Sequence, residues 1–529
     1  MGGKIARYLN QLIVGNVFDA PEILENYATD RSALKIKPKF VALPETTDDV
    51  RKLMKFFTQL ASKDIKVPIA IRGSGLDEMG ADLSSGLVIS TEKLNRLLES
   101  DRRERLVRVQ AGITLKELNT ALSVNGLTIP IGGHEMETIG GLISNCPSDD
   151  YAGKYGGIRT YVERIEVVLA NGEILQTGRF MGSTLKRKTK EKTAEGEICR
   201  KLLAVAKENE ALLKTMRKTR VGLAGYPMIA RAVKKNTLDL MPLFFGAEGT
   251  LGVITEVILR AVPIARRPQR VVATFDDFKM AEKFLDLANS LKPRELNLYD
   301  VRVIKGAEET GKKLSEITKK MEDGFVVLAQ YDRKAKGCIR KIESVRKVLP
   351  KTTKLLVESP KNKPALDELC NSLTSFLHHT KAGERVPILT DFAVPGRNLG
   401  NFLRDLETLE RSLGLDLAIF GSYAATNYHL RPRFKIDDPD FPRKAATFLK
   451  TGAFLIGRNG GSITGGAPEG RVKAIVTNDQ FTEAEKNMYE TIKQIFDRYD
   501  ILNSQVKLGA NTRSTLTHFR TTSSAKIMI

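Results

Sequence analysis

The stretch FFGAEGTLGVITEVILR, residues 244–260, joins a glycine-rich turn to a β-branched run that predicts a strand from Val253 to Arg260. A second stretch, VPIAIRGSGLDEMGADLSSGLVIS at residues 67–90, places RGSG at the end of an apolar strand. Glycines in such turns permit positive φ angles and leave backbone N–H groups open to a phosphate. The two stretches predict a pyrophosphate cradle, although either glycine turn alone is also compatible with a plain connection.

Length and charge set broad limits on the architecture and the partners. A chain of 529 residues is too long for one hydrophobic core, so two or three domains are expected. The formal net charge of +21 favours anionic partners: nucleic acid, acidic lipid, a phosphate-bearing cofactor or an acidic redox protein.

The spacing of the four cysteines and the lack of a long apolar run exclude several classes of protein. Cys146, Cys199, Cys338 and Cys370 are far apart and form no C-x-x-C pair, so neither an iron–sulfur cluster nor a structural zinc site is expected. No apolar run reaches membrane-spanning length. We therefore expect a cytoplasmic protein, at most peripheral to an anionic membrane.

The first two blocks of the chain alternate predicted strands and helices. Strands are expected at residues 40–43, 67–72, 87–90 and 107–110, and helices begin near Thr46 and at the Thr114/Glu117 capping box. Residues 158–170 and 243–245 are further predicted strands. Between them, residues 179–235 carry sixteen Lys or Arg against five Glu, largely with helical periodicity, and are predicted to be a basic helical insertion.

The third block, after Pro263, repeats a strand–helix–strand order with long connections. This order predicts an α+β sheet covered by helices on one face. The last residues, 509–529, contain no acidic residue and are expected to be a poorly ordered basic tail.

Six motifs together resemble the FAD-linked D-2-hydroxy-acid dehydrogenases of the vanillyl-alcohol oxidase superfamily, which include D-lactate dehydrogenase and the glycolate oxidase flavoprotein subunit. The motifs are RGSG at Arg72, TIGGLISN at Thr138, KYGGIRTYVERIEVVLANGEIL at Lys154, FFGAEGTLGVITE at Phe244, GGSITGG at Gly460 and ILNSQVK at Ile501. They span residues 35 to 507 in the family's order.

The resemblance implies an α+β fold, with a two-subdomain FAD-binding domain of the PCMH type followed by a ferredoxin-like cap. The implied division is an N-terminal segment at 1–34, the FAD domain at 35–265 (subdomains 35–110 and 111–265) and the cap at 266–508. Carried over by position, the FAD-binding residues are Arg72, Gly73, Ser74, Gly75, Leu76, Thr138, Gly140, Gly141, Ser144, Asn145, Gly252, Val253, Ile254 and Asn503. Ser504 stands where the family usually has proline.

The resemblance also bears on how the flavin is held. A covalent bond to the flavin in this superfamily starts from a histidine in or just after the first phosphate loop, and residues 72–80 contain none. His134 and Cys146 match no linkage position. We therefore expect noncovalent FAD.

The family's catalytic motifs are incomplete in this chain. They supply histidine and glutamate ligands for a divalent metal, and a histidine that takes the substrate hydroxyl proton. Here Ser422, Gly466 and Ala467 replace three of those positions and only His429 remains. One histidine offers too few donors for a divalent ion, so no catalytic metal is expected.

The remaining candidates for catalysis are each open to a second interpretation. Glu469 is a possible substitute base or a solvated loop residue. Arg431, with Arg433, is a possible clamp for a substrate carboxylate or part of a surface strand. Tyr423 and Tyr428 are candidates to bind a substrate hydroxyl or to pack in the core.

Three functions remain compatible with the sequence. The first is an FAD-dependent oxidoreductase that passes a hydride from a small hydroxy-acid, alcohol or sugar-like substrate to flavin N5 without a metal. Its substrate is expected to differ from an ordinary D-2-hydroxy acid, and its acceptor is oxygen, a quinone or an electron-transfer protein. The second is a catalytically impaired flavin-binding protein with a binding or assembly role. The third, a nucleic-acid or anionic-surface binder, is disfavoured because the basic insertion lacks interleaved aromatic residues and any nucleic-acid module.

Overall fold

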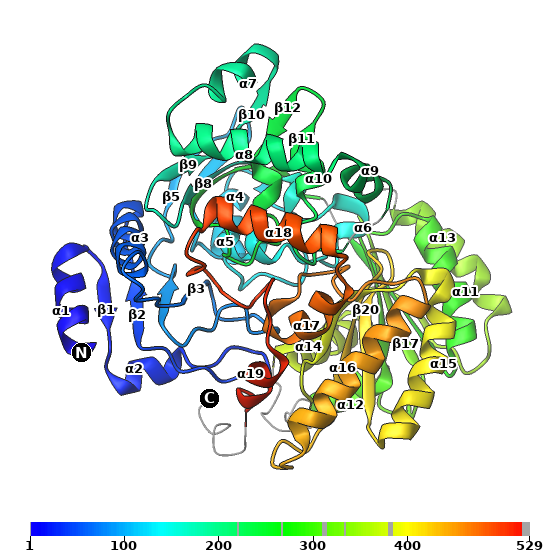
Figure 1. Ribbon diagram of the computed structural model, residues 1–529. Helices are drawn as coiled ribbons and strands as arrows, with labels where there is room; N and C mark the ends of the chain where they lie inside the picture. The colour runs from blue at the N-terminus through cyan, green and yellow to red at the C-terminus, as the bar shows by residue number, and fades with distance from the viewer. Residues whose placement is uncertain are drawn as a thin grey trace.

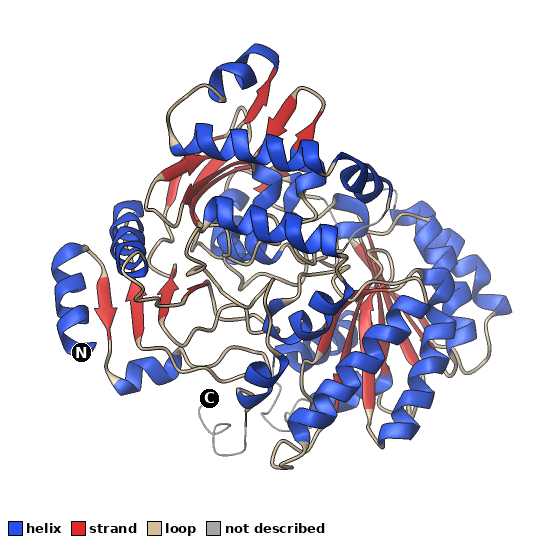
Figure 2. Ribbon diagram, in the orientation of Figure 1, coloured by secondary structure: helices blue, strands red, loops and turns tan. Residues whose placement is uncertain are grey.

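The computed structural model describes residues 2–219, 222–265, 268–308, 315–332, 335–378 and 385–520. Figure 1 shows the N-terminal unit on the left, the cap on the right and the insertion at the top, and Figure 2 shows helices around three main sheets.

The N-terminal unit is a four-stranded sheet of order β1-β2-β4-β3, in which β2, β4 and β3 are parallel. The Thr46 side chain caps α3 by accepting the Asp49 N–H, and the Asp49 side chain accepts the Thr46 N–H in return. The predicted boundary at residue 34 is wrong, because β1 from the N-terminal segment pairs with β2. The elements are α1 (Gly2–Leu12), β1 (Asn16–Phe18), α2 (Pro21–Asn26), β2 (Phe40–Leu43), α3 (Thr47–Ala61), β3 (Ile69–Arg72) and β4 (Leu87–Ser90).

The second unit is an antiparallel sheet of order β5-β6-β13-β8-β9. Its central strand, β13, is the β-branched run of the opening stretch and pairs with β6 and β8. The predicted subdomain boundary at residue 110 is therefore two strands too late, since β5 and β6 belong to this sheet. The elements are β5 (Leu97–Asp101), β6 (Leu106–Gln110), α4 (Leu115–Ser123), β7 (Leu127–Thr128), α5 (Ile139–Asn145), α6 (Ala152–Tyr155), η1 (Ile158–Thr160), β8 (Val162–Val168), β9 (Ile174–Gln176), β13 (Val253–Arg260) and β14 (Val262–Pro263).

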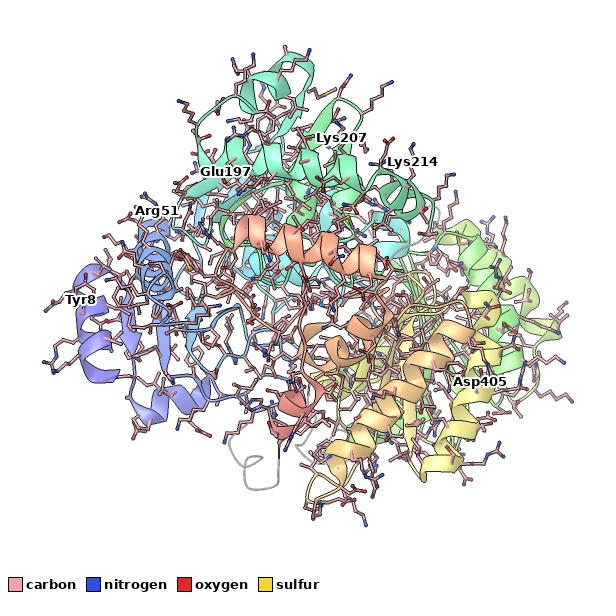
Figure 3. All side chains as sticks on the ribbon, viewed as in Figure 1. Tyr8, Arg51, Glu197, Lys207, Lys214 and Asp405 are labelled. Atoms are coloured by element: carbon pink, nitrogen blue, oxygen red, sulfur yellow. The ribbon has the colours of Figure 1, made fainter. Side chains whose placement is uncertain are left out.

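The basic insertion contains strands as well as helices. A three-stranded sheet of order β10-β12-β11 accompanies the helices, so the prediction of a basic helical insertion describes the segment only in part. Figure 3 labels Lys207 of α8 and Lys214 of α9 on this part of the molecule. The elements are β10 (Arg179–Met181), α7 (Gly182–Lys188), α8 (Ala194–Glu208), α9 (Glu210–Lys218), α10 (Ile229–Ala232), β11 (Val233–Lys234), β12 (Thr237–Asp239) and η2 (Met241–Phe244).

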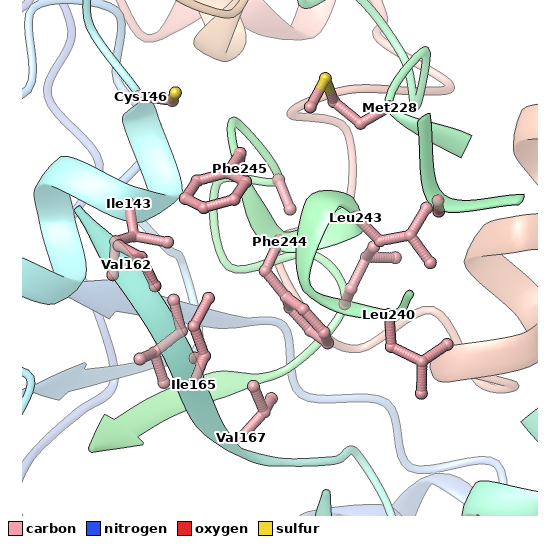
Figure 4. Packing of buried hydrophobic residues seen from close by; sticks show 14 of the residues in the cluster. Ile143, Cys146, Val162, Ile165, Val167, Met228, Leu240, Leu243, Phe244 and Phe245 are labelled. Atoms are coloured by element: carbon pink, nitrogen blue, oxygen red, sulfur yellow. The ribbon is translucent and has the colours of Figure 1, made fainter. Parts of the chain in front are cut away.

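The predicted strand at residues 243–245 is wrong, because this short apolar run forms the end of the 3₁₀ helix η2 and its C-cap. Leu243, Phe244 and Phe245 are buried in the core that also contains Ile165 and Val167 of β8 (Figure 4). Periodicity does not separate a buried strand from a buried turn over so few residues.

The cap is built on a seven-stranded antiparallel sheet of order β18-β15-β17-β16-β20-β21-β19. Helices cover both faces, not one as predicted: α11, α13, α15 and α16 pack on one face, and α12 and α14 on the other. The reason is visible in β15, where the neighbouring residues Val271 and Val272 point to opposite faces and are both fully buried. The elements are β15 (Gln269–Phe275), α11 (Phe278–Ser290), β16 (Glu295–Asp300), α12 (Val301–Glu308), β17 (Phe325–Tyr331), α13 (Ala335–Ser344), η3 (Val345–Val348), β18 (Leu355–Val357), α14 (Lys363–His378), β19 (Leu389–Ala393), α15 (Gly396–Leu413), β20 (Leu417–Ser422), β21 (Asn427–Pro432), α16 (Phe441–Arg458), α17 (Gly470–Thr477) and η4 (Asn478–Gln480).

The chain leaves the cap before residue 508. Helix α18 (Glu483–Phe496) packs in the core of the second unit, and Leu502 forms a bridge with Ile69 of β3. The predicted disordered tail is also ordered in part: it forms α19 (Thr512–Thr517), and Phe519 bridges to Leu34. Residues 521–529 lie outside the described residues.

Candidate functional site

A first cavity, here called the cradle cavity, lies where β3, α5 and the turn before β13 meet. It measures about 760 Å³ including its open mouth. Gly73 illustrates why the cradle needs glycine, because a Cβ on it would collide with the Thr138 hydroxyl across the cavity. Thr138 is also the N-cap of α5, and its hydroxyl accepts the Gly141 N–H at 3.1 Å. The two distant glycine segments of the sequence are therefore side by side.

Most of the predicted FAD-binding residues line the cradle cavity. They are Gly73, Ser74, Gly75, Leu76, Thr138, Gly140, Gly141, Ser144, Asn145, Gly252 and Ile254. A cavity of this size and length, framed by backbone-rich turns, fits a dinucleotide.

Three predicted FAD-binding residues do not line the cavity. The Arg72 guanidinium donates to Thr29 O at 2.9 Å and lies 3.7 Å from Asp82 Oδ1, so it supports the loop from outside. Val253 is fully buried in the core of the N-terminal unit. Asn503 is buried and its Nδ2 donates to the carbonyls of Ala81 and Glu248, which ties the two walls of the cradle together.

Acidic residues in the cradle were missed from the sequence. Asp77 and Glu248 both line it, and burial raises the pKa of Asp77 to about 7 and that of Glu248 to about 8. The signal was present in both opening stretches, because RGSGLDEMGAD holds three carboxylates shortly after its glycines and GAEGT places Glu248 between glycines.

Glu469 is neither a free base nor a solvated loop residue. It is fully buried, its Oε2 accepts from Lys507 Nζ at 2.9 Å and its Oε1 accepts the Gly225 N–H at 2.8 Å. Glu248 lies 3.4 Å from the same ammonium group. Glu469 therefore stabilises the packing of the cap against the cradle, and the prediction that it is a catalytic base is wrong in this geometry.

A second cavity, here called the substrate cavity, opens between the cradle and the cap sheet. It measures about 1080 Å³ including its mouth and shares Leu76, Asp77, Glu137 and Asn145 with the cradle cavity. His429 and Arg431 of β21 line it, as does Asp391 of β19. Tyr423 and Tyr428 do not line it and are buried in the cap core, as the packing alternative predicts.

Arg431 is already engaged by a carboxylate of the protein. Its Nη2 donates to both Glu78 oxygens, at 2.6 and 2.8 Å, and the guanidinium lies over the Phe420 ring. Arg433, on the same strand's continuation, pairs with Asp416 at 3.3 Å. Neither arginine is free to clamp a substrate carboxylate, so that prediction is wrong in this geometry.

His429 is placed as a neutral base. Its ring stacks on Phe420, and Nδ1 lies 2.5 Å from the Thr390 hydroxyl, which donates its hydrogen to Glu78 at 3.0 Å. Because a hydroxyl has one hydrogen, Nδ1 carries the hydrogen of this contact and Nε2 is left with a lone pair. The Asp391 N–H also points at Nδ1, but its 3.4 Å separation is longer than an ordinary hydrogen bond, so the 2.5 Å contact with Thr390 decides the assignment. Burial lowers the pKa of His429 below its ordinary value, which keeps the ring neutral.

The residues do not fit the metal site that the resemblance implies. A side chain at Gly466 would collide with Asn427 Oδ1, so no ligand fits there without rearrangement. A different trio, Glu78, Asp391 and His429, brings its ligand atoms within 4.8 Å of one another. The Arg431 guanidinium pairs with Glu78 of this trio but not with Asp391, and the trio shares only His429 with the family's metal site. The absence of a catalytic metal stays a prediction.

Two further residues of the substrate cavity escaped the sequence analysis. His134 pairs with Glu137 at 2.7 Å; burial opposes its charge, but the carboxylate outweighs burial and raises the pKa of His134 to about 10. Arg31, from the loop between α2 and β2, lines the cavity, and its side chain has no hydrogen bond or ion pair to any described residue. No local motif marks it, because only the fold brings residue 31 to residue 429.

The comparisons with protein families agree with this geometry. The FAD binding domain model matches residues 38–178, and the model of the C-terminal domain of FAD-linked oxidases matches residues 265–506. No helix among the described residues has the length and apolar character needed to cross a bilayer.

Curated relatives are similar over most of the chain. The glycolate oxidase subunit GlcD of Bacillus subtilis is 24% identical, over 88% of this chain and 88% of its own. An uncharacterized FAD-linked oxidoreductase of Mycobacterium tuberculosis is 26% identical, over 96% of this chain and its full length. D-2-hydroxyglutarate dehydrogenase of Pantoea ananatis is 25% identical over 90% of this chain, which spans only 48% of that relative.

Solved structures share the fold. The 4-ethylphenol oxidase of Gulosibacter chungangensis has a TM-score of 0.65 at 15% identity, over 95% of this chain and 96% of its own. The corresponding values for p-cresol methylhydroxylase are 0.68 and 13%, over 96% and 98%. The solved structures agree in fold, and the two FAD-family domain models match in order along the chain, so the chain belongs to the FAD-linked oxidases, with FAD as its cofactor.

Proposed function

We propose that this protein oxidises the hydroxyl-bearing carbon of a small anionic 2-hydroxy acid, with noncovalently bound FAD as the hydride acceptor. The observation that carries the proposal is the substrate cavity, which joins the cradle and holds both a neutral His429 and Arg31, a cation with no side-chain hydrogen bond or ion pair to the described residues. The relatives named for glycolate, D-lactate and D-2-hydroxyglutarate support the same substrate class.

Arg31 is the group that holds the substrate carboxylate in this proposal. Burial lowers the pKa of its guanidinium from the ordinary value, and Arg431 adds to that effect while Glu78 and Glu137 oppose it. The side chain remains a cation at neutral pH, and its fork of donors matches a carboxylate. A bound carboxylate would supply the partner that the cavity wall does not.

His429 takes the hydroxyl proton at Nε2. Its ring is held by the Phe420 stack and by the Thr390 contact, so its orientation is fixed before substrate arrives. Once protonated, the ring faces Asp391 Oδ2 at 3.9 Å from Nδ1 and the ionised Glu78 beyond Thr390. These two carboxylates stabilise the imidazolium cation in place of a metal. Bound FAD supplies the two-electron acceptor for the hydride that leaves the carbinol carbon.

Noncovalent binding of FAD is supported by the residues of the cradle. Among the described residues that line it, none is a histidine, cysteine or tyrosine that would carry a bond to the flavin ring. Release of all the yellow colour from acid-precipitated protein is the expected result.

The proposal is tested by anaerobic addition of substrates to the purified yellow protein. D-2-hydroxy acids of two to five carbons should bleach the flavin, whereas the methyl esters and the acids without the hydroxyl group should not. Bleaching by neutral alcohols or sugars as fast as by the acids would contradict the assignment of Arg31. If hydroxy acids, neutral alcohols and sugars all fail to bleach the flavin, the result would favour the alternative, a flavin-binding protein without dehydrogenase activity.

A further inference from the structure

A third cavity, here called the basic cavity, lies beneath the insertion on the other side of the Pro147–Ser148 wall from the substrate cavity. It measures about 1380 Å³ including its mouth. Four cationic side chains line it, and among its described lining residues none is acidic. They come from four separate elements: Arg159 of η1, Arg217 of α9, Arg231 of α10 and Lys234 of β11.

Among the described residues, none of these four cations forms an ion pair with a carboxylate, although Arg217 acts on Glu210 and Lys234 on Asp239 at longer range. Arg217 donates only to two backbone carbonyls, Ala230 O at 2.8 Å and Val233 O at 2.7 Å. Arg159 contacts the Met228 sulfur at 3.8 Å. Arg231 and Lys234 form no side-chain hydrogen bond or ion pair with any described residue.

The neighbouring cations of the insertion show that partners are available to it. Lys188 pairs with Glu191 at 2.8 Å and with Glu195 at 2.7 Å, and Lys214 pairs with Glu210 at 2.9 Å. Some cations of the outer helices are therefore ion-paired, whereas the four that converge on the basic cavity form no ion pair with the described residues. Like charges gathered around one concavity repel one another and concentrate a positive potential inside it.

The cavity has an apolar inner wall as well as a charged rim. Cys146, Met216, Leu223 and Met228 line it. Figure 4 shows Cys146 at the end of α5 and Met228 on the same side of the Phe245 ring. An apolar wall with a few charged donors is typical of a small-molecule site.

We propose that the basic cavity binds a small soluble molecule bearing a phosphate group or a comparable multivalent anion. Four cations exceed what one carboxylate needs, and arginine donors match phosphate oxygens in pairs. The concave shape favours a small anion over a flat bilayer surface. This site is separate from the cradle, because the two cavities share no lining residue.

An occupant of the basic cavity would be in contact with the substrate cavity wall. Pro147 and Ser148 line both cavities. The Ser148 N–H donates to Gly466 O at 2.6 Å, and its carbonyl accepts from Asn427 Nδ2 at 2.9 Å. The wall is thus a single hydrogen-bonded segment, through which a small anion bound in the basic cavity would contact the substrate cavity.

The test is a calorimetric titration of inorganic pyrophosphate into the FAD-loaded protein, so that the cradle is already filled. Saturable binding is expected, and the double variant Arg231→Gln, Lys234→Gln should weaken it about tenfold or more. The matched control is Lys186→Gln, Arg187→Gln, which removes the same two charge types from exposed positions of α7 that do not line the cavity. The control should bind pyrophosphate like the parent protein.

Three results would overturn the proposal: no saturable binding to the parent, equal weakening in both double variants, or unchanged binding in the cavity variant. Retention on phosphatidylserine vesicles without pyrophosphate binding would also overturn it and would indicate a membrane surface. Unchanged flavin absorbance in each variant verifies that the fold is intact. None of these readouts depends on turnover, so failure here is distinguishable from failure of the proposed oxidation.

Discussion

The cradle cavity and the substrate cavity lie side by side but are built from different materials. The cradle is shaped by backbone, with glycines whose missing side chains leave the space. The substrate cavity is shaped by charged side chains from segments as distant as Arg31, Glu78 and His429. A cofactor site shaped by backbone turns can therefore be predicted from sequence motifs. The reactivity of the neighbouring substrate cavity cannot, because it depends on which charged side chains the fold pairs with one another.

Replacing His429 in the substrate cavity is expected to have the largest effect, and only on turnover. His429→Asn removes the proton acceptor, so the turnover rate should fall about 10²- to 10⁴-fold while FAD content stays at the parent level. Rapid-mixing measurements of flavin reduction by a D-2-hydroxy acid test this. A loss below threefold would show that another group takes the proton.

A substitution of Gly73 should weaken FAD binding in the cradle cavity without changing any residue of the substrate cavity. Gly73→Val places branched carbons against the Thr138 hydroxyl, and strain of about 1–3 kcal/mol should weaken FAD binding about ten- to a hundredfold. Fluorescence titration of the apoprotein with FAD measures it. Gly457→Ala is the control, since a Cβ there meets no atom within 4 Å on an exposed helix, and it should leave affinity unchanged. Equal affinity in both variants would contradict the placement of FAD.

Arg31 sharpens the account of substrate binding. Arg31→Gln should lower kcat/KM for a hydroxy acid about ten- to a hundredfold, mainly through KM, because it removes the cation expected to meet the carboxylate. Arg31→Lys should restore part of the loss. Arg433→Gln, at the position that pairs with Asp416, should leave kcat/KM close to the parent value. A larger loss of kcat/KM in Arg433→Gln than in Arg31→Gln would instead assign binding of the substrate carboxylate to Arg433.

The smallest expected effect is a pH dependence of FAD affinity. Asp77 and Glu248 have pKa values raised to about 7 and about 8, so they are neutral below those values and become anions as pH rises. The ionised carboxylates then repel the FAD diphosphate, and affinity should fall about tenfold or less between pH 6 and pH 9. Asp77→Asn, which keeps the oxygen that accepts the Met79 and Ala81 N–H groups, should remove the step near pH 7. An affinity that rises with pH would contradict this.

The sequence predicted the cradle well because its determinants are local. RGSG after a strand and TIGGLISN with its Thr138 cap fix the backbone that frames the space, and eleven of the fourteen residues predicted to bind FAD line it. Arg72 and Asn503 were predicted to contact FAD, but they do not line the cavity. Each forms hydrogen bonds that hold the cradle wall in place.

The substrate cavity resisted prediction because side-chain partners are set by the fold. Arg431 seemed free in the motif HLRPRF, but Glu78 from the phosphate loop saturates it. The glycine-rich loop around Glu469 favours an exposed side chain, but the fold buries it and pairs it with Lys507, which follows α18. Arg31 lies in a segment that the family resemblance did not cover, so no motif could place it beside His429.

The most direct test records the flavin spectrum of two variants before and after anaerobic addition of a D-2-hydroxy acid. The account predicts that Gly73→Val is purified largely colourless, whereas His429→Asn is yellow and stays yellow after the acid is added. A yellow Gly73→Val protein together with a rapidly bleached His429→Asn protein would contradict the assignment of FAD and substrate to these two adjoining cavities.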